Sequence, residues 1–259
     1  MNKKDKKQAK FAAKKNFHVV YGKHAVEAIL ANSKRIVYNL FLSHELKNQV
    51  NLHDHQGINI EYCDKERLTK LCKDGEKHQG YIAYVGDLLQ DLSLEDYILN
   101  FQKQNNVKII ILDQINDPHN LGAILRSAMC FSVDLVIITK YNMPPINSSV
   151  IRSSAGMSEY IDILTVVNLS DTISALKAAN IYVIGMDLDG ENKNIANIME
   201  DKSKIAVVMG SEGFGIRPSV SKSCDIIARI GMNPGAESLN VSNAAAIAMY
   251  EMFKNTHQD

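Results

Sequence analysis

Short apolar runs, rich in β-branched residues, recur through the second half of this chain and set the strongest limit on its fold. They lie at 107–112, 135–139, 181–185, 205–209 and 226–230. Unbroken runs of this kind are typical of strands that are buried on both faces, as in a parallel sheet. Helical patterns fit the segments between and after them, at 121–131, 148–154, 170–179, 218–223 and 241–253. The alternation predicts an α/β fold with a parallel sheet over residues 107–256.

The first half of the chain predicts a second, smaller α/β domain over residues 17–87, of a size that can fold alone. Its expected strands are 36–42, 58–62 and 80–85, and its expected helices are 22–30, 46–56 and 65–72. The polar stretch 88–106 has neither a strand period nor a cluster of proline and glycine. We expect it to be a partly helical connector between the two domains.

Composition limits the class of protein. The chain has 259 residues, 46% hydrophobic and 22% charged, which is typical of a soluble globular protein with one or two domains. No apolar run reaches the about 18–20 residues that span a bilayer, and no apolar segment follows the N-terminal lysines as in a secretory signal. The four cysteines form no C-x-x-C pair. We therefore expect no disulfide framework, no bound metal, no membrane partner and a reducing, cytoplasmic setting.

Charge is distributed unevenly along the chain. Residues 1–15 hold seven lysines and one aspartate, whereas the formal net charge of the whole chain is zero. We expect residues 1–16 to be a disordered tail. Two roles are open for it: to keep the protein in solution, or to give a salt-dependent attraction to the phosphates of nucleic acid.

The first of three polar motifs spans 116–126 and follows the strand expected at 107–112. Pro118 suits a turn, and Asn120 is expected to cap the next helix by accepting a hydrogen bond from a free backbone N–H. Arg126 lies six residues later on the same helix, where a guanidinium can clamp a phosphate or polarise a hydroxyl. Taken alone, the motif is equally explained by a helix cap followed by a surface arginine.

The second motif, 210–215, is rich in glycine and follows the strand expected at 205–209. It is not a dinucleotide or phosphate loop, because position 218 is proline and no Gly-Lys-Ser/Thr follows. Its backbone groups are open to a ligand, and Glu212 places a carboxylate beside them. Taken alone, a tight turn is the simpler explanation.

The third motif, 238–242, precedes an alanine-rich helix and supplies a hydroxyl from Ser238 and an amide from Asn240. Position 241 is valine, so the acid of a capping box is missing. The small side chains of 244–248 allow close packing against a partner subunit or a neighbouring loop. Because carboxyl ends of parallel strands meet at one edge of a sheet, we expect the three motifs to gather there.

Taken together, five polar residues resemble, in order and spacing, the signature residues of the SpoU family of RNA ribose 2′-O-methyltransferases. They are Asn120, Arg126, Glu212, Ser238 and Asn240. Upstream, residues 20–26 and 78–83 are similar to the RNA substrate-binding domain of the bacterial 23S rRNA guanosine 2′-O-methyltransferase branch. The resemblance covers residues 18–255.

This resemblance implies a trefoil-knotted methyltransferase domain at 107–256, S-adenosylmethionine as the methyl donor and a homodimer formed through the knotted domain. It implies that Gly210, Ile230 and Leu239 bind the donor, largely through backbone groups. The loop 231–235 departs from the family's usual Ile-Pro-Met opening, with glycine at 231 and proline moved to 234. This loop borders the implied donor pocket, and its contacts are left open.

The resemblance also implies catalytic roles. Arg126 would polarise or deprotonate the ribose 2′-hydroxyl near a phosphate of the acceptor, although transfer assisted by that phosphate is equally open because arginine rarely loses its proton. Asn120 and Glu212 would orient Arg126 and the loop. Ser238 and Asn240 would position the ribose.

The acceptor is expected to be RNA, with a guanosine of 23S rRNA as first choice and a tRNA ribose as second. The N-terminal domain would grip a stem-loop by shape and unpaired bases, with phosphate contacts from the tail and from Lys23, Lys140 and Arg152. One rival is an RNA-binding or ribosome-assembly factor that keeps the fold without the chemistry. A nicotinamide dehydrogenase is a weaker rival, because the early glycine fingerprint is missing.

Overall fold

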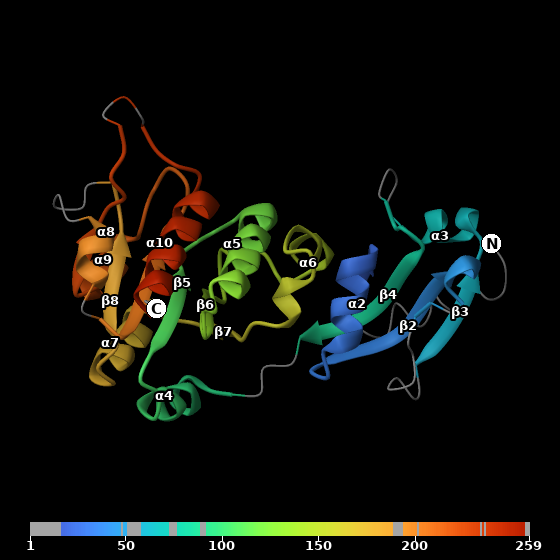
Figure 1. Cartoon of the computed structure of the whole chain (residues 1–259), viewed down its shortest axis with the longest axis horizontal. Helices are drawn as coiled ribbons and strands as arrows, with labels where there is room; N and C mark the ends of the chain where they lie inside the picture. Colours follow the sequence, from blue (N-terminus) through green and yellow to red (C-terminus); the bar gives the residue numbers. More distant parts are fainter. Residues whose placement is uncertain are drawn as a thin grey trace. The chain divides into compact units, whose positions relative to one another are not determined.

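The computed structural model describes residues 17–47, 49–50, 58–72, 77–88, 92–188, 194–200, 202–233, 235 and 237–256. These residues fall into two compact units (Figure 1). One is drawn from residues 1–89 and 146–160, and the other from residues 90–145 and 161–259. The lysine-rich tail, 1–16, lies outside the described residues.

The larger unit is built on a six-stranded sheet in the order β10-β8-β9-β5-β6-β7, and every neighbouring pair in it is parallel. The strands are β5 (Val107–Leu112), β6 (Leu135–Thr139), β7 (Ile163–Val166), β8 (Tyr182–Met186), β9 (Lys204–Met209) and β10 (Ile226–Ala228). All six residues of β5 are buried. The predicted α/β class, with a parallel sheet and a smaller N-terminal α/β domain, is confirmed.

The helices of this unit cover both faces of the sheet. They are α4 (Leu94–Gln102), α5 (Pro118–Cys130), α7 (Leu169–Ala178), α8 (Ile195–Met199), α9 (Pro218–Ser223) and α10 (Val241–Thr256). Ile109 of β5 belongs to one apolar cluster with Phe101 of α4 and Ile173 of α7. Lys108 points to the other face, where its Nζ lies 5.4 Å from the ring centroid of Phe253 in α10. The alternation along β5 therefore assigns α4 and α7 to one face and α10 to the other.

The smaller unit has a four-stranded sheet in the order β1-β4-β2-β3, in which only β2 and β3 run parallel among the described pairs. Its strands are β1 (His18–Tyr21), β2 (Arg35–Ser43), β3 (Asn59–Cys63) and β4 (Tyr81–Leu88). Its helical segments are α2 (Lys23–Ala31), η1 (His44–Leu46), α3 (Lys65–Leu71), α6 (Ser148–Ser153) and η2 (Met157–Glu159).

Some elements differ from those expected. The short strands β1 and β7 and the short helix α8 were not predicted. Of the helix expected at 46–56, the described residues after Leu46 form a turn and a bend, and the remainder lies outside the described residues. The stretch 88–106 contains α4, which begins at a capping box made by Ser93 and Asp96. Tyr97 and Phe101 of this helix are buried in the core of the larger unit.

The segment 146–160 belongs to the smaller unit, although it lies between two strands of the larger sheet in the sequence. Ile151 of α6 is fully buried in the same apolar cluster as Val26 of α2. Gly156 has a φ of +83°, and a Cβ at this position would lie 2.6 Å from the Cβ of Ala28. Glycine is therefore needed at 156 both for the backbone conformation and for the close approach to α2.

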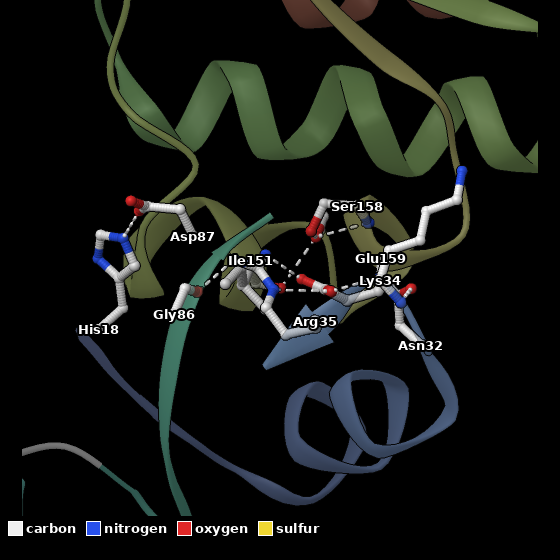
Figure 2. Close-up of polar contacts among 10 residues, drawn as sticks. His18, Asn32, Lys34, Arg35, Gly86, Asp87, Ile151, Ser158 and Glu159 are labelled. Carbon is white, nitrogen blue, oxygen red and sulfur yellow. Dashed lines mark hydrogen bonds and ion pairs between the residues drawn. The ribbon is translucent and has the colours of Figure 1, made fainter. Parts of the chain in front are cut away.

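A buried ion pair fixes this segment to β2 (Figure 2). The Nη2 of Arg35 lies 2.6 Å from Oε1 of Glu159, and its Nε donates to Oε2 at 3.1 Å. Arg35 Nη1 also donates to the carbonyl of Gly86, and Asn32 Nδ2 donates to Glu159 Oε2. Both charged side chains are completely buried. Such a pair is tolerated in a core only because its two-pronged geometry and additional hydrogen bonds compensate for lost hydration.

We predict that Glu159→Ala destabilises the protein by about 3–5 kcal/mol, because it leaves the Arg35 guanidinium buried without its counter-charge. Urea unfolding of the full chain measures the change. Glu66→Ala is the matched control, since it removes the exposed pair between Glu66 and Lys70 in α3 of the same unit and should cost only about 0.3–0.5 kcal/mol. Equal losses in the two variants would contradict the assigned role of the buried pair.

Candidate active site

A cavity of about 790 Å³ opens at the carboxyl-terminal edge of the larger sheet. Its wall contains all three residues predicted to bind the donor, together with three of the five residues predicted to be catalytic. These are Gly210, Ile230, Leu239, Glu212, Ser238 and Asn240. The second and third motifs therefore meet at one site, as expected from their positions after strands.

The wall also includes residues that the sequence analysis missed, namely Met186, Asp187 and Leu188 at the end of β8, and Arg229 after β10. The sequence did contain a signal for Met186, Asp187 and Leu188. The run 181–185 was predicted as a strand of the same parallel sheet, so the residues after it had to reach the same edge.

The glycine-rich motif forms a closed loop. Ser211 and Gly215 exchange two backbone hydrogen bonds, with N···O distances of 3.1 and 3.0 Å. A Cβ on Gly210 would lie 2.1 Å from the carbonyl carbon of Gly215, so no side chain fits there. The motif is thus a tight turn, as the simpler explanation proposed, and it also lines the cavity.

The first motif starts its helix earlier than predicted. Asp117 caps α5, because its Oδ1 accepts a hydrogen bond from the N–H of His119 at 2.8 Å. The prediction that Asn120 caps this helix is wrong. Pro118, whose fixed φ suits the first helical position, sets the start of the helix two residues before Asn120. The amide of Asn120 is therefore not needed at the helix end.

Instead, Asn120 joins the other two motifs through Glu212. Asn120 Nδ2 donates to Glu212 Oε1 at 3.0 Å, and Asn240 Nδ2 donates to the same oxygen at 2.6 Å. Asn240 Nδ2 also donates to Asn120 Oδ1 at 3.1 Å, and the N–H of Val241 donates to Glu212 Oε1 at 3.4 Å. One residue from each motif is thus held in a single hydrogen-bonded cluster, which we call the amide–carboxylate cluster.

The orientation of the Asn240 amide follows from its surroundings. Its Oδ1 accepts hydrogen bonds from the N–H and the hydroxyl of Ser242, at 2.9 and 2.5 Å, at the start of α10. The oxygen is therefore used to cap the helix, which leaves the Nδ2 hydrogens for Glu212 and Asn120. The cap of α10 and the amide–carboxylate cluster therefore both depend on the side chain of Asn240.

The other two residues predicted to be catalytic, Ser238 and Arg126, are not part of this cluster. Ser238 is exposed on the cavity wall and makes no hydrogen bond to another described residue. Arg126 is exposed on α5, outside the cavity wall, and its guanidinium has no hydrogen bond or ion pair within the described part of the chain. Six residues on a helix with about 3.6 residues per turn place Arg126 on a different face from Asn120. Neither Asn120 nor Glu212 hydrogen-bonds to Arg126.

The chemistry of the wall fits S-adenosylmethionine. Met186, Met209 and Leu239 offer apolar surface for an adenine ring, and Asp187 and Glu237 supply carboxylates for the cationic groups of the donor. The volume lies within the range of about 300–1,000 Å³ that is usual for small-molecule sites. Of the atypical loop, Met232 lines the cavity, and Pro234 lies outside the described residues.

Three of the predicted RNA-binding residues make specific contacts, and two of them, Arg152 and Lys23, lie in the smaller unit. Arg152 Nη1 donates to the hydroxyl of Tyr21 at 2.6 Å, with the guanidinium 4.3 Å from the centroid of the Tyr21 ring. The backbone N–H of Lys23 donates to Gln79 Oε1. Lys140, in the larger unit, lies with its Nζ 5.8 Å from the ring centroid of Tyr141.

The motif at 78–83 shapes a turn in the smaller unit. The Nδ1 of His78 accepts a hydrogen bond from the N–H of Gly80 at 3.0 Å. Burial, with a smaller effect from Lys65, lowers the pKa of His78. The neutral ring that this favours is the form that can accept the bond from Gly80.

Two classes of feature are absent from the described part of the chain. No helix there is long and apolar enough to cross a membrane. Among the same residues, no group of three or more His, Cys, Asp and Glu side chains is arranged to hold a metal ion.

Comparison with known families gives two matches that together span most of the chain. Residues 108–250 match the SpoU rRNA Methylase family. Residues 19–88 match the family described as RNA 2′-O ribose methyltransferase substrate binding.

Two curated relatives are similar over nearly their full length. The 23S rRNA (guanosine-2′-O-)-methyltransferase RlmB of Neisseria meningitidis is 33% identical over 242 residues, covering 91% of this chain and 94% of that protein. The enzyme of the same name from Escherichia coli K12 is 32% identical over 240 residues, covering 90% of this chain and 96% of that protein.

Solved structures share the fold. The AdoMet-bound rRNA methyltransferase of Sinorhizobium meliloti superposes with a TM-score of 0.78 at 20% identity, covering 97% of this chain and 92% of that one. The SpoU methyltransferase AviRb of Streptomyces viridochromogenes gives a TM-score of 0.75 at 18% identity, covering 100% of this chain and 95% of that one.

We predict that Glu212→Ala loosens the glycine loop and the start of α10, because it removes the acceptor shared by Asn120, Asn240 and Val241. Leaving the buried amide of Asn120 without its acceptor should lower the local opening free energy by about 1–3 kcal/mol, measured by native-state amide hydrogen exchange of residues 210–215 and 241–245. Glu237→Ala is the matched control. Its carboxylate lines the same cavity but has no hydrogen bond to another described residue. The same loosening in both variants would contradict the role of the amide–carboxylate cluster.

Proposed function

Because this chain belongs to the SpoU rRNA methylase family, we propose that it transfers a methyl group from S-adenosylmethionine to the 2′-hydroxyl of a guanosine ribose in 23S rRNA. The chain is an RNA 2′-O-methyltransferase with both the methyltransferase and the substrate-binding region of that class. The choice of 23S rRNA rests on the names of the full-length relatives.

The observation that carries this proposal is the amide–carboxylate cluster beside a donor-sized cavity. It joins one residue from each of the three motifs, Asn120, Glu212 and Asn240, through hydrogen bonds of 2.6–3.1 Å. When bound, S-adenosylmethionine supplies an activated methyl group on a positively charged sulfur. We propose that Gly210, Ile230 and Leu239 bind it, since all three lie on the cavity wall.

The protein's own residues must align the acceptor and help to remove its proton. Precise alignment can contribute several kcal/mol and a positioned base a factor of about 10²–10⁴. We propose that the amide–carboxylate cluster keeps the loops in place, since the polar atoms of Asn240 are already hydrogen-bonded to the protein. Ser238, exposed on the wall, is the residue we assign to the ribose.

Arg126 is proposed to act on the acceptor. It is exposed and has no ionic partner among the described residues, so its charge is available for a phosphate next to the reactive ribose. In that position its charge would polarise the 2′-hydroxyl, or, after losing its own proton, the neutral guanidine would accept the proton of the hydroxyl. Transfer of the proton to the phosphate itself is the alternative, because a guanidinium holds its proton strongly.

We propose that the protein acts as a homodimer in the cytoplasm. Three large apolar side chains are exposed on the packed helices α5 and α10, namely Met129, Ile247 and Tyr250. A second copy of the chain would bury this face. The cysteines that are described form no disulfide, which suits a reducing compartment. The smaller unit is proposed to hold the RNA, through residues such as Lys23 and Arg152.

The acceptor is tested by nucleoside mass spectrometry of rRNA and tRNA from a strain that lacks the gene. We expect one 2′-O-methylguanosine to disappear from 23S rRNA and to return with a plasmid copy. Loss of a tRNA methylation instead would identify the alternative acceptor. An unchanged set of nucleosides, together with no binding of S-adenosylmethionine by the purified protein, would support a factor that keeps the fold without the chemistry.

We predict that Arg126→Ala lowers the single-turnover rate of methyl transfer by about 10²–10⁴-fold, while calorimetry shows unchanged affinity for S-adenosylmethionine. Arg126→Lys should recover only part of the rate, because lysine keeps the charge but not the planar fork. Lys222→Ala, which removes an exposed charge on α9, is the control and should leave the rate unchanged. Near-normal turnover by Arg126→Ala with intact donor binding would show the assignment to be wrong.

A further inference from the structure

Phe214 stands at the tip of the glycine loop with its side chain in solvent. It is 92% exposed, and the next most exposed large apolar residue in the described part of the chain is Val167 at 70%. Burying a phenylalanine side chain is favourable, so leaving one in water forgoes a large stabilisation. Phe214 also belongs to the wall of the candidate active site. An exposed aromatic ring on the wall of the candidate active site suggests that it contacts a group brought to the site by the substrate.

The loop that carries Phe214 is fixed from several sides. Ser211 and Gly215 close it with two backbone hydrogen bonds, and Glu212 ties it to Asn120 and Asn240. Gly215 has a φ of +64°, and a Cβ there would lie 2.9 Å from Oδ2 of Asp187. The ring is therefore presented by a held backbone rather than by a free chain, so little conformational entropy is lost when a partner binds.

The space around the tip is open. Gly213 has a φ of +89°, and a Cβ at this position would meet no atom within 4 Å. A flat group can therefore approach the tip without displacing protein atoms. By contrast, the apolar surface deeper in the cavity comes from residues such as Met186, which is 8% exposed, and Met209, which is 3% exposed. The adenine of the donor can bind to this inner surface, so Phe214 is not needed to bind the adenine.

The charge of the wall favours a nucleobase over a phosphate. Asp187, Glu212 and Glu237 lie on the same wall as the single arginine among its residues, Arg229. Carboxylates repel the phosphates of RNA, whereas the face of a base is uncharged. Unpaired bases of RNA are commonly recognised by stacking on aromatic side chains, in a way that tolerates any base.

We propose that Phe214 is a stacking platform for an unpaired nucleobase of the RNA at the acceptor site. The proposal rests on the proposed function, because it places the base beside the ribose that is methylated. Stacking would hold the extruded nucleotide while the cluster below keeps the loop in position. Phe214 is thus a substrate-binding residue that the sequence analysis did not single out, although it lies in the second motif.

The test compares Phe214→Ala, Phe214→Leu and Phe214→Trp in the full-length protein, with unmodified 23S rRNA from the deletion strain as substrate. We expect Phe214→Ala to raise the KM for RNA by about 5- to 150-fold, corresponding to the about 1–3 kcal/mol that alanine substitution removes per stacked base. Phe214→Trp should keep a low KM. Phe214→Leu should resemble Phe214→Ala, because it keeps apolar bulk without an aromatic face. Thermal unfolding should be unchanged in all three, since the ring is exposed.

Three results would overturn the stacking role. Equal rescue by leucine and tryptophan would show that apolar bulk is enough. A weaker affinity of Phe214→Ala for S-adenosylmethionine would assign the ring to the donor. A change from dimer to monomer in light scattering would assign it to contact with a second copy of the chain.

A second readout separates this proposal from the proposed function. The probe is an unstructured RNA decamer with one 2-aminopurine, whose fluorescence is quenched on stacking. We expect quenching by the natural protein and by Phe214→Trp, and none by Phe214→Ala. If the natural protein quenches the probe but methylates no RNA, the proposed function fails and the stacking role stands. If it methylates RNA and Phe214→Ala quenches equally, the stacking role fails alone.

Discussion

The register of three neighbouring parallel strands is the constraint on which the site depends. Leu112 of β5 pairs with Met209 of β9, and Met209 pairs with Met186 of β8, so the three strands end side by side. The loops that follow them must therefore start at one edge of the sheet. Close packing of apolar side chains on both faces holds this register, because a shift by one residue would turn every side chain to the opposite face, against neighbours of different shape.

Two carboxylates then tie the loops together. Glu212 Oε1 accepts hydrogen bonds from Asn120 and Asn240, and Asp113, which is fully buried, accepts two from Arg217, at 3.0 Å from the backbone N–H and 2.8 Å from Nε. Residues 213–216, which include the tip of the glycine loop, lie between Glu212 and Arg217 in the sequence and are thus held at both ends. Hydrogen bonds to charged acceptors are stronger than neutral ones. They allow a loop in which half of the residues are glycine to present Phe214 and its backbone groups in one arrangement.

In the smaller unit, too, a buried carboxylate holds distant parts of the chain together. Arg35 and Glu159 are both buried and pair through two hydrogen bonds. Arg35 also donates to the carbonyl of Gly86, and Glu159 also accepts a hydrogen bond from Asn32. The pair holds a segment that the sequence places between β6 and β7 of the larger sheet. A buried pair is costly when one partner is lost. The attachment of 146–160 therefore requires both residues, because losing one would leave the other charge buried without its partner.

Local pattern in the sequence determined five of the six strands of the larger sheet, all except β7, and the order of the three motifs. The runs at 107–112 and 135–139 were predicted with the bounds that β5 and β6 have, because an apolar run with polar ends needs no distant partner to be recognised. Tertiary structure alone decided which side chains meet. Asn120 was expected at a helix cap, yet it bonds to Glu212, 92 residues away, and Arg35 bonds to Glu159, 124 residues away. A single sequence carries the periodicity that makes a strand or a helix, but side-chain pairing over such separations exists only once the chain has folded, because it depends on the packing of the whole.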